Sequence, residues 1–187
     1  MRGQTARSGV LSQTANCGYG PSSQEFLPWG DPASYYLAPQ GDIASTSNWS
    51  LSHVTVAADH DSFSGSAGSI VLASDNASAE TPVACVNLQN PTMRFFLTHS
   101  GPRSASALDV YVVYEGLDGH PHTLTLASLA ASDSWQPSLV IPIGVNALST
   151  ASVNGWTPVS FGFAVHGLKP GESYSIDGVY VDPIWSR

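Results

Sequence analysis

Residues 107–119 read ALDVYVVYEGLDG, and this stretch indicates the fold most directly. Its side chains alternate between two faces, with Leu108, Val110, Val112 and Tyr114 on one and Asp109, Tyr111 and Val113 on the other. A period of two is typical of a β-strand with one buried face. The segment that follows contains two glycines within six residues, Glu115–His120, so we expect a turn there and a hairpin built from the strands on either side.

The rest of the chain repeats this pattern of short β-rich runs separated by Gly, Pro, Asn, Asp and Ser. No 11-residue window shows helical periodicity. The predicted strands are Trp49–Ala57, Ser69–Ala73, Val83–Leu88, Thr92–His99, Ala107–Glu115, His122–Leu129, Trp135–Ile141, Val159–Val165 and Tyr174–Val181. This spacing predicts an all-β protein, an antiparallel two-sheet β-sandwich of jelly-roll type, with residues 25–187 in a single domain.

Length and charge limit the classes of partner. The chain has 187 residues, a net charge of −8 and a single lysine, Lys169. Nucleic acids and anionic membranes attract clustered Lys and Arg, so neither is expected as a partner. No apolar run approaches the roughly 20 residues needed to cross a bilayer, so membrane insertion is not expected either.

The two cysteines, Cys17 and Cys85, allow two interpretations. An even cysteine count in a Ser-, Thr- and Gly-rich chain with little lysine favours an exported protein with one disulfide, secreted or at the cell surface. The alternative is two buried free thiols in a cytoplasmic protein. Residues 1–24 are polar and glycine-rich without periodicity, so we expect a flexible N-terminal arm that is anchored near Cys17.

Aromatic residues exceed what a core needs, and sugars present apolar C–H faces that stack on aromatic rings. Trp49, Trp135 and Tyr174 lie within strand patterns and are predicted to be core residues. Trp156, in the loop VNGWTP, and Tyr111, on the face opposite the Leu and Val row, are the candidate ligand-binding residues.

Catalytic motifs are not apparent in the sequence. It contains no H-E-x-x-H, no G-x-S-x-G and no nucleotide-binding fingerprint. Asp177 and Asp182 are five residues apart on an expected strand, so they should point to opposite faces and cannot form a catalytic pair. Asp59 and Asp61 are interpreted as carboxylates of a solvated loop. We therefore expect no enzyme activity.

The order of several segments resembles a known family. GDI and WSL (41–43 and 49–51) come first, SIVLA, PVACVNL and TMRFFLTH follow, and FGFAVHG and SIDGVYVDP close the chain. This order resembles the jelly-roll, galactose-binding-like carbohydrate-binding modules over residues 26–184, and it is more similar still to uncharacterised secreted β-sandwich proteins of actinobacteria. The resemblance implies a β-sandwich binding module.

The same resemblance implies a structural calcium ion at one sheet edge, held by Asp177 and by the stretch around Asp42. Two acidic positions of the family pattern are Ala44 and Gly178 in this chain. The alternative role for Asp177 is to accept hydrogen bonds from backbone amides. The stretch SIDGVYVDP should be the closing strand, paired with an early strand near residues 41–51, with Ile176, Gly178 and Tyr180 facing the core and a bulge at Gly178.

The sequence is compatible with three functions. The first is a non-catalytic exported binding module for a glycan or cell-wall polymer. The second is a structural or self-assembling extracellular protein that forms homo-oligomers, which low charge, an N-terminal arm and exposed aromatics would suit. The third is a hydrolase.

Overall fold

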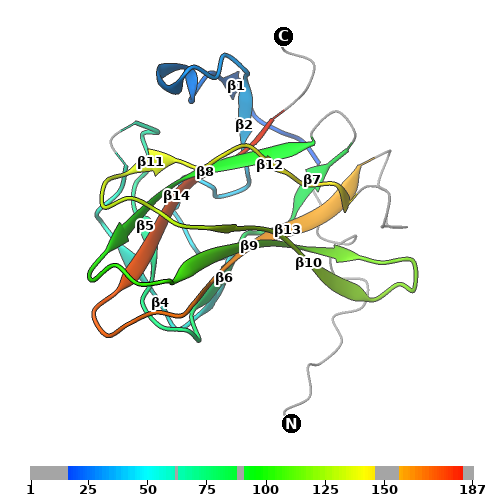
Figure 1. The fold of residues 1–187 in the computed structure, drawn as a ribbon. Helices are drawn as coiled ribbons and strands as arrows, with labels where there is room; N and C mark the ends of the chain where they lie inside the picture. The colour runs from blue at the N-terminus through cyan, green and yellow to red at the C-terminus, as the bar shows by residue number, and fades with distance from the viewer. Residues whose placement is uncertain (1–16, 62, 88–90, 146–155, 183–187) are drawn as a thin grey trace.

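A computed structural model of the chain, which describes residues 17–61, 63–87, 91–145 and 156–182, shows two antiparallel β-sheets packed face to face (Figure 1). The predicted two-sheet β-sandwich is confirmed. Its core lies between the sheets and includes Leu108, Val110 and Val112, the apolar row that the alternation identified, all completely buried.

The first sheet has eight strands. They are β1 (Ser22–Ser23), β2 (Tyr35–Leu37), β4 (Val54–Ala57), β5 (Ser69–Leu72), β8 (Thr92–Ser100), β11 (Gln136–Pro137), β12 (Ile141–Pro142) and β14 (Ser173–Asp182). Their order is β1-β2-β14-β5-β4, and β8 pairs with β14, β11 and β12.

The second sheet has six strands. They are β3 (Ser50–Ser52), β6 (Ser78–Glu80), β7 (Ala84–Val86), β9 (Ala107–Glu115), β10 (Pro121–Leu129) and β13 (Thr157–His166). Their order is β10-β9-β13-β6-β3, with β7 paired to β13. The expected hairpin is confirmed as β9–β10, whose turn is closed by a hydrogen bond from the Gly116 amide to the His120 carbonyl at 2.9 Å.

The single strand predicted at residues 49–57 is wrong. The chain forms β3 in the six-stranded sheet and β4 in the eight-stranded sheet, with His53 between them. His53 has a φ of 53°, a left-handed conformation that interrupts an extended chain. The predicted strand at residues 135–141 is likewise divided into β11 and β12, both of which pair with β8. Strands β1, β2 and β6 were not predicted.

The closing strand β14 carries the predicted bulge. Its register with β8 shifts between Asp177 and Tyr180, and Gly178 has a φ of 55°. The extra residue lets Ile176 and Val179 both join the main core. Tyr180 was expected to face that core and does not, because the shift turns it to the outer face, where it packs in a second cluster with Phe96.

The early partner of β14 also differs from the prediction. β14 pairs with β2 at Tyr36 and Leu37, whereas β3 lies in the other sheet. Gly41 still contacts the closing strand, because its carbonyl accepts a hydrogen bond from the Val179 amide at 3.0 Å. The Val179 carbonyl also accepts a hydrogen bond from the Ala38 amide at 2.9 Å, so two backbone bonds join the early segment to β14 beyond the end of β2.

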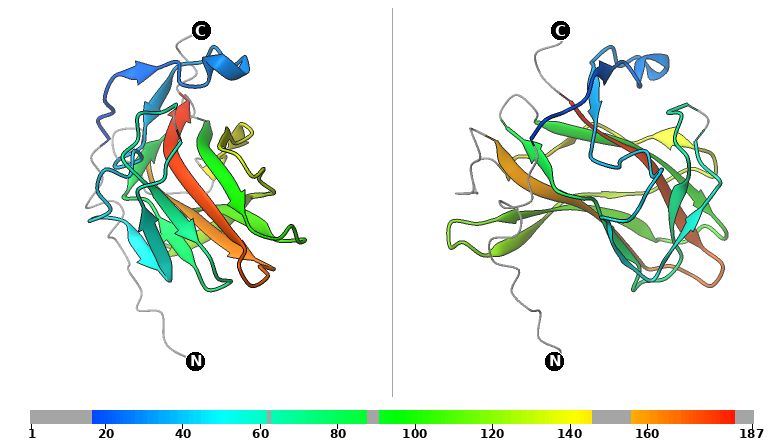
Figure 2. Two further views of the ribbon diagram at one scale, coloured as in Figure 1. Left: turned by 90° about the vertical axis from the view of Figure 1, so that its left-hand side faces the viewer. Right: turned by 180° about the vertical axis from the view of Figure 1, so that it is seen from behind.

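A third, smaller layer covers part of the outer face of the eight-stranded sheet. The segment around the 3-10 helix η1 (Leu27–Trp29) lies outside the sandwich (Figure 2). It contributes Phe26, which is completely buried against Tyr35, Phe96 and Tyr180. The predicted disulfide is confirmed: Cys17 and Cys85 are bonded and tie the chain near residue 17 to β7. Residues 1–16 of the expected arm lie outside the described residues.

Candidate functional site

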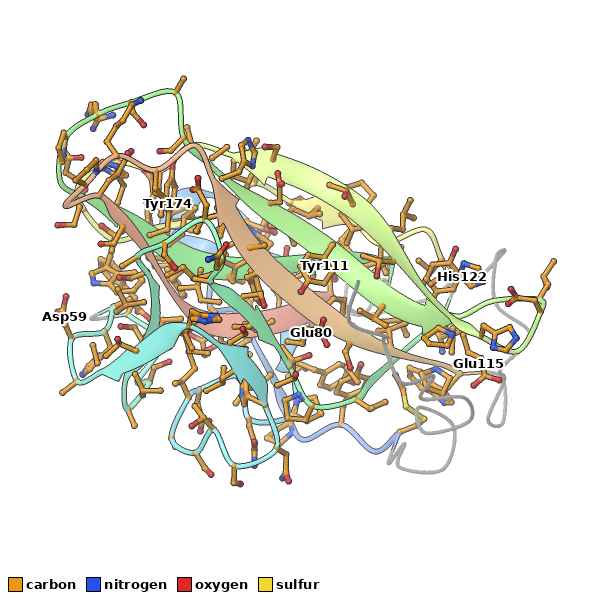
Figure 3. All side chains as sticks on the ribbon, turned by 90° about the horizontal axis from the view of Figure 1, so that it is seen from below. Asp59, Glu80, Tyr111, Glu115, His122 and Tyr174 are labelled. Atoms are coloured by element: carbon orange, nitrogen blue, oxygen red, sulfur yellow. A yellow bond between two sulfur atoms is a disulfide. The ribbon has the colours of Figure 1, made fainter. Side chains whose placement is uncertain are left out.

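The outer face of the six-stranded sheet carries a row of side chains that crosses five strands. The pairing register aligns Thr125, Tyr111, Gly162, Glu80 and Ser50, on β10, β9, β13, β6 and β3. Neighbouring strands are about 4.8 Å apart, so the row spans roughly 19 Å. Figure 3, which views this sheet from outside, shows Tyr111 and Glu80 on either side of β13.

Tyr111 lies flat across the middle of this row. A Cβ atom on Gly162 would come within 2.0 Å of the Tyr111 ring, so only glycine leaves room for the ring to rest on β13. The Tyr111 hydroxyl donates a hydrogen bond to Glu80 Oε1 at 3.1 Å. Burial, followed by the charge and hydrogen bond of Glu80, raises the pKa of Tyr111 above its ordinary value, so the hydroxyl stays protonated.

Small polar residues surround the ring. The next row along the strands aligns Ser128, Asp109, Ala164, Ser78 and Ser52. Asp109 Oδ2 lies 3.0 Å from His166 Nδ1, so these two side chains on β9 and β13 are joined by a hydrogen bond beside the row. One aromatic face flanked by hydroxyl and carboxylate groups can stack on the apolar face of a sugar and hydrogen-bond its hydroxyls.

Trp156, the other candidate ligand-binding residue, lies elsewhere. It immediately precedes β13 and is half-buried, with its ring 5.8 Å from the ring of Tyr19. Tyr19 in turn stacks on Tyr36 at 5.1 Å and donates a hydrogen bond to the Cys85 carbonyl. Trp156 therefore belongs to an aromatic group beside the disulfide. Of the predicted core aromatics, Trp49 and Tyr174 are buried, and Trp135 packs half-buried against the outer cluster.

The arrangement around Asp177 does not fit the implied calcium site. Asp177 is completely buried and accepts hydrogen bonds from the amides of Gly178 at 2.6 Å and Asp61 at 3.3 Å. Asp42 instead accepts from the Ala44 amide in its own turn. Among the residues that the structure describes, no three His, Cys, Asp or Glu side chains are grouped to hold a metal. The alternative, Asp177 as acceptor of backbone hydrogen bonds, describes the observed contacts.

Two expectations about aspartates are wrong. Asp61 is completely buried beside Asp177, whereas a solvated loop position was expected. Asp177 and Asp182 do not point to opposite faces, because the bulge at Gly178 adds a residue between them. Their partners on β8, Phe96 and Thr92, share the outer face, and so do the two aspartates.

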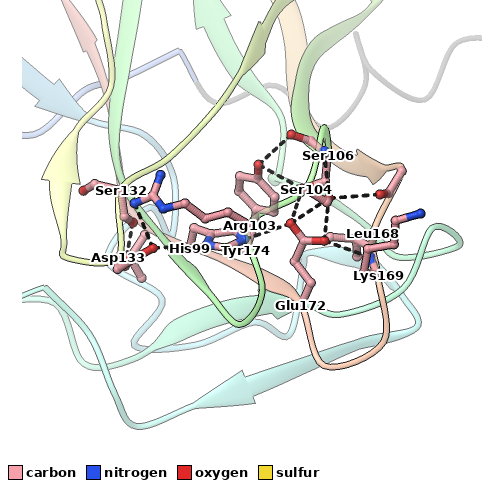
Figure 4. Close-up of polar contacts among 12 residues, drawn as sticks. His99, Arg103, Ser104, Ser106, Ser132, Asp133, Leu168, Lys169, Glu172 and Tyr174 are labelled. Carbon is pink, nitrogen blue, oxygen red and sulfur yellow. Dashed lines mark hydrogen bonds and ion pairs between the residues drawn. The ribbon is translucent and has the colours of Figure 1, made fainter.

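A buried polar network at one end of the sandwich contains His, Glu and Ser side chains (Figure 4). His99 Nε2 lies 2.9 Å from Glu172 Oε1, and His99 Nδ1 lies 3.3 Å from Asp133 Oδ1. Ser104 and Ser106 donate hydrogen bonds to Glu172. Both ring nitrogens of His99 face carboxylates and both serines donate to Glu172, so the imidazole is the hydrogen-bond partner of the carboxylates and not of the serines.

Tyr111 is a candidate ligand-binding residue on sequence grounds, whereas the two residues that position its ring were not predicted. Glu80 and Gly162 are 31 and 51 residues away along the chain, and only the sheet register brings them together. A glycine within the strand pattern FGFAV was a usable signal, because such a glycine often marks close approach of another group.

Within the described part of the chain, no helix has the length and apolar character required to span a membrane. No protein-family model and no curated protein matches the sequence.

Solved structures, in contrast, match most of the chain. The CBM22-1 xylan-binding domain of Xyn10C from Paenibacillus barcinonensis has a TM-score of 0.52 and 11% identity, over 83% of this chain and 97% of that domain. The C-terminal family 22 carbohydrate-binding module of Clostridium thermocellum Xyn10B has a TM-score of 0.49 and 12% identity, over 82% and 96%. A CBM29-2 mutant has a TM-score of 0.46 and 12% identity, over 80% and 92%.

At these identities the likeness concerns the fold alone. The resemblance to jelly-roll carbohydrate-binding modules is confirmed at that level, and the expected closeness to actinobacterial proteins finds no support in these matches. The chain is therefore similar in fold, over nearly the whole length of the xylan-binding domain, to a β-sandwich of the carbohydrate-binding-module type.

Proposed function

We propose that this chain is a non-catalytic glycan-binding module of an exported protein, and that it binds its ligand on the outer face of the six-stranded sheet. The observation that carries the proposal is the Tyr111 ring, which lies flat on Gly162 and is tied to Glu80 at 3.1 Å. A ring held in this way is ready for stacking before the ligand arrives, so little entropy is lost on binding.

The surroundings of Tyr111 suit a neutral polysaccharide. Glu80 and Asp109 accept hydrogen bonds from sugar hydroxyls, and Thr125 both donates and accepts. The acidic protein, with its net charge of −8, would repel a strongly anionic chain. The fold-level likeness to a xylan-binding domain supports a polysaccharide as the class of ligand. Trp156, at the start of β13, is a candidate for additional contacts with a longer chain.

An exported location is part of the same proposal. The Cys17–Cys85 disulfide supports it, because structural disulfides persist mainly in oxidising compartments. Plant and bacterial cell-wall polysaccharides are found in such surroundings, where a binding module would meet them.

The test is binding to a panel of immobilised neutral polysaccharides, followed by titration with soluble oligosaccharides of the best ligand. Tyr111→Ala should weaken binding roughly tenfold or more, because stacking is lost. Tyr111→Phe keeps the ring and should weaken binding by only about threefold. Gly162→Ala should resemble Tyr111→Ala, because its methyl group displaces the ring.

Leu117→Ala is the matched control, since Leu117 is 73% exposed at the tip of the β9–β10 hairpin. It should bind like the parent. If a polysaccharide binds and Tyr111→Ala binds it equally well, the outer-face site is wrong. If nothing on the panel binds, glycan recognition on this face is wrong as well.

A further inference from the structure

Strand β10 is a long edge of the six-stranded sheet. It has nine residues, and within residues 17–61, 63–87, 91–145 and 156–182 the only strand that pairs with it is β9. The other strands at sheet edges are short: β1, β11 and β12 have two residues each, β3 has three and β4 has four. Proteins keep their edges short because an open edge is a template for another strand, so β10 is the edge at which a strand can add.

The hairpin register shows which backbone groups of β10 point away from β9. The Gly116 amide donates to the His120 carbonyl at 2.9 Å, so these two residues form a hydrogen-bonded pair at the turn. Bonded and non-bonded pairs alternate along an antiparallel ladder, which places Thr123 and Thr125 in non-bonded pairs with β9. Their backbone N–H and C=O groups therefore face the open edge. The hairpin also projects at one end of the sandwich, which leaves this edge accessible (Figure 1 and Figure 2).

The composition of β10 favours a second copy of the same strand as the partner. Its sequence, PHTLTLASL, contains no Lys, Arg, Asp or Glu. A charged partner strand would gain no ion pair from it, whereas an identical strand needs none. The protein has a net charge of −8, so two copies repel one another over much of their surface, but β10 itself brings no carboxylate to a contact.

Exposed apolar side chains lie on the same flank of the sandwich. β12, at the edge of the eight-stranded sheet, lies beside β10. Leu139 and Val140, which connect β11 to β12, are 75% and 48% exposed. Leu124 shares the inner face of its sheet with its partner Val112 and is 36% exposed at the open edge. A strand added to β10 would cover apolar surface here in addition to completing backbone hydrogen bonds.

The dimensions of the flank suit a weak, reversible contact. Nine extended residues are about 30 Å long, and two stacked sheets make the flank roughly 20 Å deep, so each of two copies would bury roughly 600 Å². Stable complexes bury about 800 Å² per partner, and smaller contacts belong to transient pairs. We therefore expect a dissociation constant in the micromolar range.

We propose that β10 pairs antiparallel with β10 of a second copy about a two-fold axis at Leu124, which joins the two six-stranded sheets into one. Thr123 of each copy then hydrogen-bonds to Thr125 of the other through the backbone groups that face the open edge. Leu124 lies opposite Leu124 of the second copy. One edge serves both copies, because a two-fold axis presents the same groups to each.

The pairing has a consequence for glycan binding that rests on the proposed function. The two-fold axis is perpendicular to the joined sheet, so both outer faces lie on the same side of it. Three strand spacings, about 14 Å, separate β9 from β9 of the second copy. One extended polysaccharide chain can then contact Tyr111 in both copies, which raises its apparent affinity. The pairing itself does not require a ligand.

The test is analytical ultracentrifugation of the full chain without ligand, from about 1 µM to about 500 µM. The mean mass should rise from that of a monomer toward that of a dimer. In parallel, amide exchange at Thr123 and Thr125 should slow as the protein concentration rises, since these amides become hydrogen-bonded in the pair. Thr123→Pro removes one outward N–H and should abolish the dimer, while the fold persists because that N–H does not bond to β9.

Leu124→Lys should weaken dimerisation roughly tenfold or more, because it places two ammonium groups opposite one another. Leu51→Lys is the matched control: Leu51 is 37% exposed on β3, the opposite edge of the same sheet, and the change in charge is identical. It should dimerise as the parent does. Thermal melts establish that each variant is folded.

A parent that stays monomeric at every concentration overturns the pairing. If the amides of Thr123 and Thr125 are protected in that monomer, the chain itself covers the edge. A dimer that Leu124→Lys and Leu51→Lys weaken equally, or not at all, also overturns it. A monomer that binds polysaccharide through Tyr111 would leave the proposed function standing, and a dimer that binds none would leave the pairing standing, so the two proposals can fail separately.

Discussion

The carboxyl group of Asp177 is completely buried, and so is that of Asp61 beside it. Burial, helped by the hydrogen bond and charge of Asp61, raises the pKa of Asp177 to about 8, although the hydrogen bonds from Ser66 and the Gly178 amide act in the opposite direction. At neutral pH the folded protein therefore holds a proton at Asp177 that the unfolded chain releases. Alternation along β14 creates this situation: Ile176 faces the main core, so the next residue, Asp177, faces outward, where the Asp61 amide donates a hydrogen bond to it.

This proton makes stability depend on pH. The pKa of Asp177 is raised on folding, so its stabilising contribution is complete below the unfolded pKa of about 4 and is lost as pH rises toward 8. Between pH 5 and pH 8 the melting temperature of the parent should fall by roughly 5 °C or more beyond any change in Asp177→Asn. The variant lacks this effect because its amide side chain cannot lose a proton. Thermal melts of both proteins across this range provide the measurement.

Asp59→Asn is the control, because Asp59 is an exposed carboxylate in the same loop. Its pH dependence should match that of the parent. The same melts in a calcium chelator test the calcium site: the geometry predicts no change, and a loss of several degrees would restore calcium as the partner of Asp177. Parallel curves for the parent and Asp177→Asn would contradict the proton assignment.

At the other end of β14, where the strand begins, one side chain, Glu172, links several segments of the chain. It is 2% exposed and accepts hydrogen bonds from the amide of Lys169 and from Ser104 and Ser106, while His99 on β8 lies 2.9 Å away. The connection before β9 and the connection before β14 are thus joined to β8 through one carboxylate. Burial opposes ionisation of Glu172, but these hydrogen bonds outweigh it and lower its pKa to about 2.

Because the pKa of Glu172 is depressed on folding, its stabilising contribution is present above the unfolded pKa of about 4.5 and is lost as pH falls toward 2. Glu172→Gln should melt at a lower temperature than the parent at pH 7, and the difference should shrink steadily between pH 4.5 and 2. The carboxylates of Asp31 and Asp133 also have lowered pKa values, so only the difference between the two proteins isolates Glu172. A difference that stays constant down to pH 2 would show that Glu172 acts through shape alone.

The overall architecture was predictable from the sequence because it follows from local periodicity and turn chemistry, as in 107–119. The bulge was predictable too, because Asp177 and the two valines could not otherwise be accommodated. The sites depend instead on the register between strands that are distant in the sequence. The placement of Tyr111 on Gly162 beside Glu80 was therefore not predictable from the sequence. The segment that carries Trp29 has no strand or helix periodicity, and its role as an outer layer follows from burial of Phe26, which no local pattern shows.

The Cys17–Cys85 disulfide holds this outer layer and the sandwich together across a separation of 68 residues. In the chain-entropy model, a loop of this length contributes about 4 kcal/mol, so the double variant Cys17→Ser/Cys85→Ser should melt roughly 10 °C lower than the parent. Removal of the disulfide should first destabilise the packing of Tyr19, Tyr36 and Trp156, because Tyr19 packs beside the bond. Amide exchange should therefore quicken around residues 17–24 and β7 before the rest of the sandwich opens.

Adding reductant should lower the melting temperature of the parent to that of the variant, while the variant itself stays unchanged. Equal melting temperatures for parent and variant would mean that the sandwich is stable without this link.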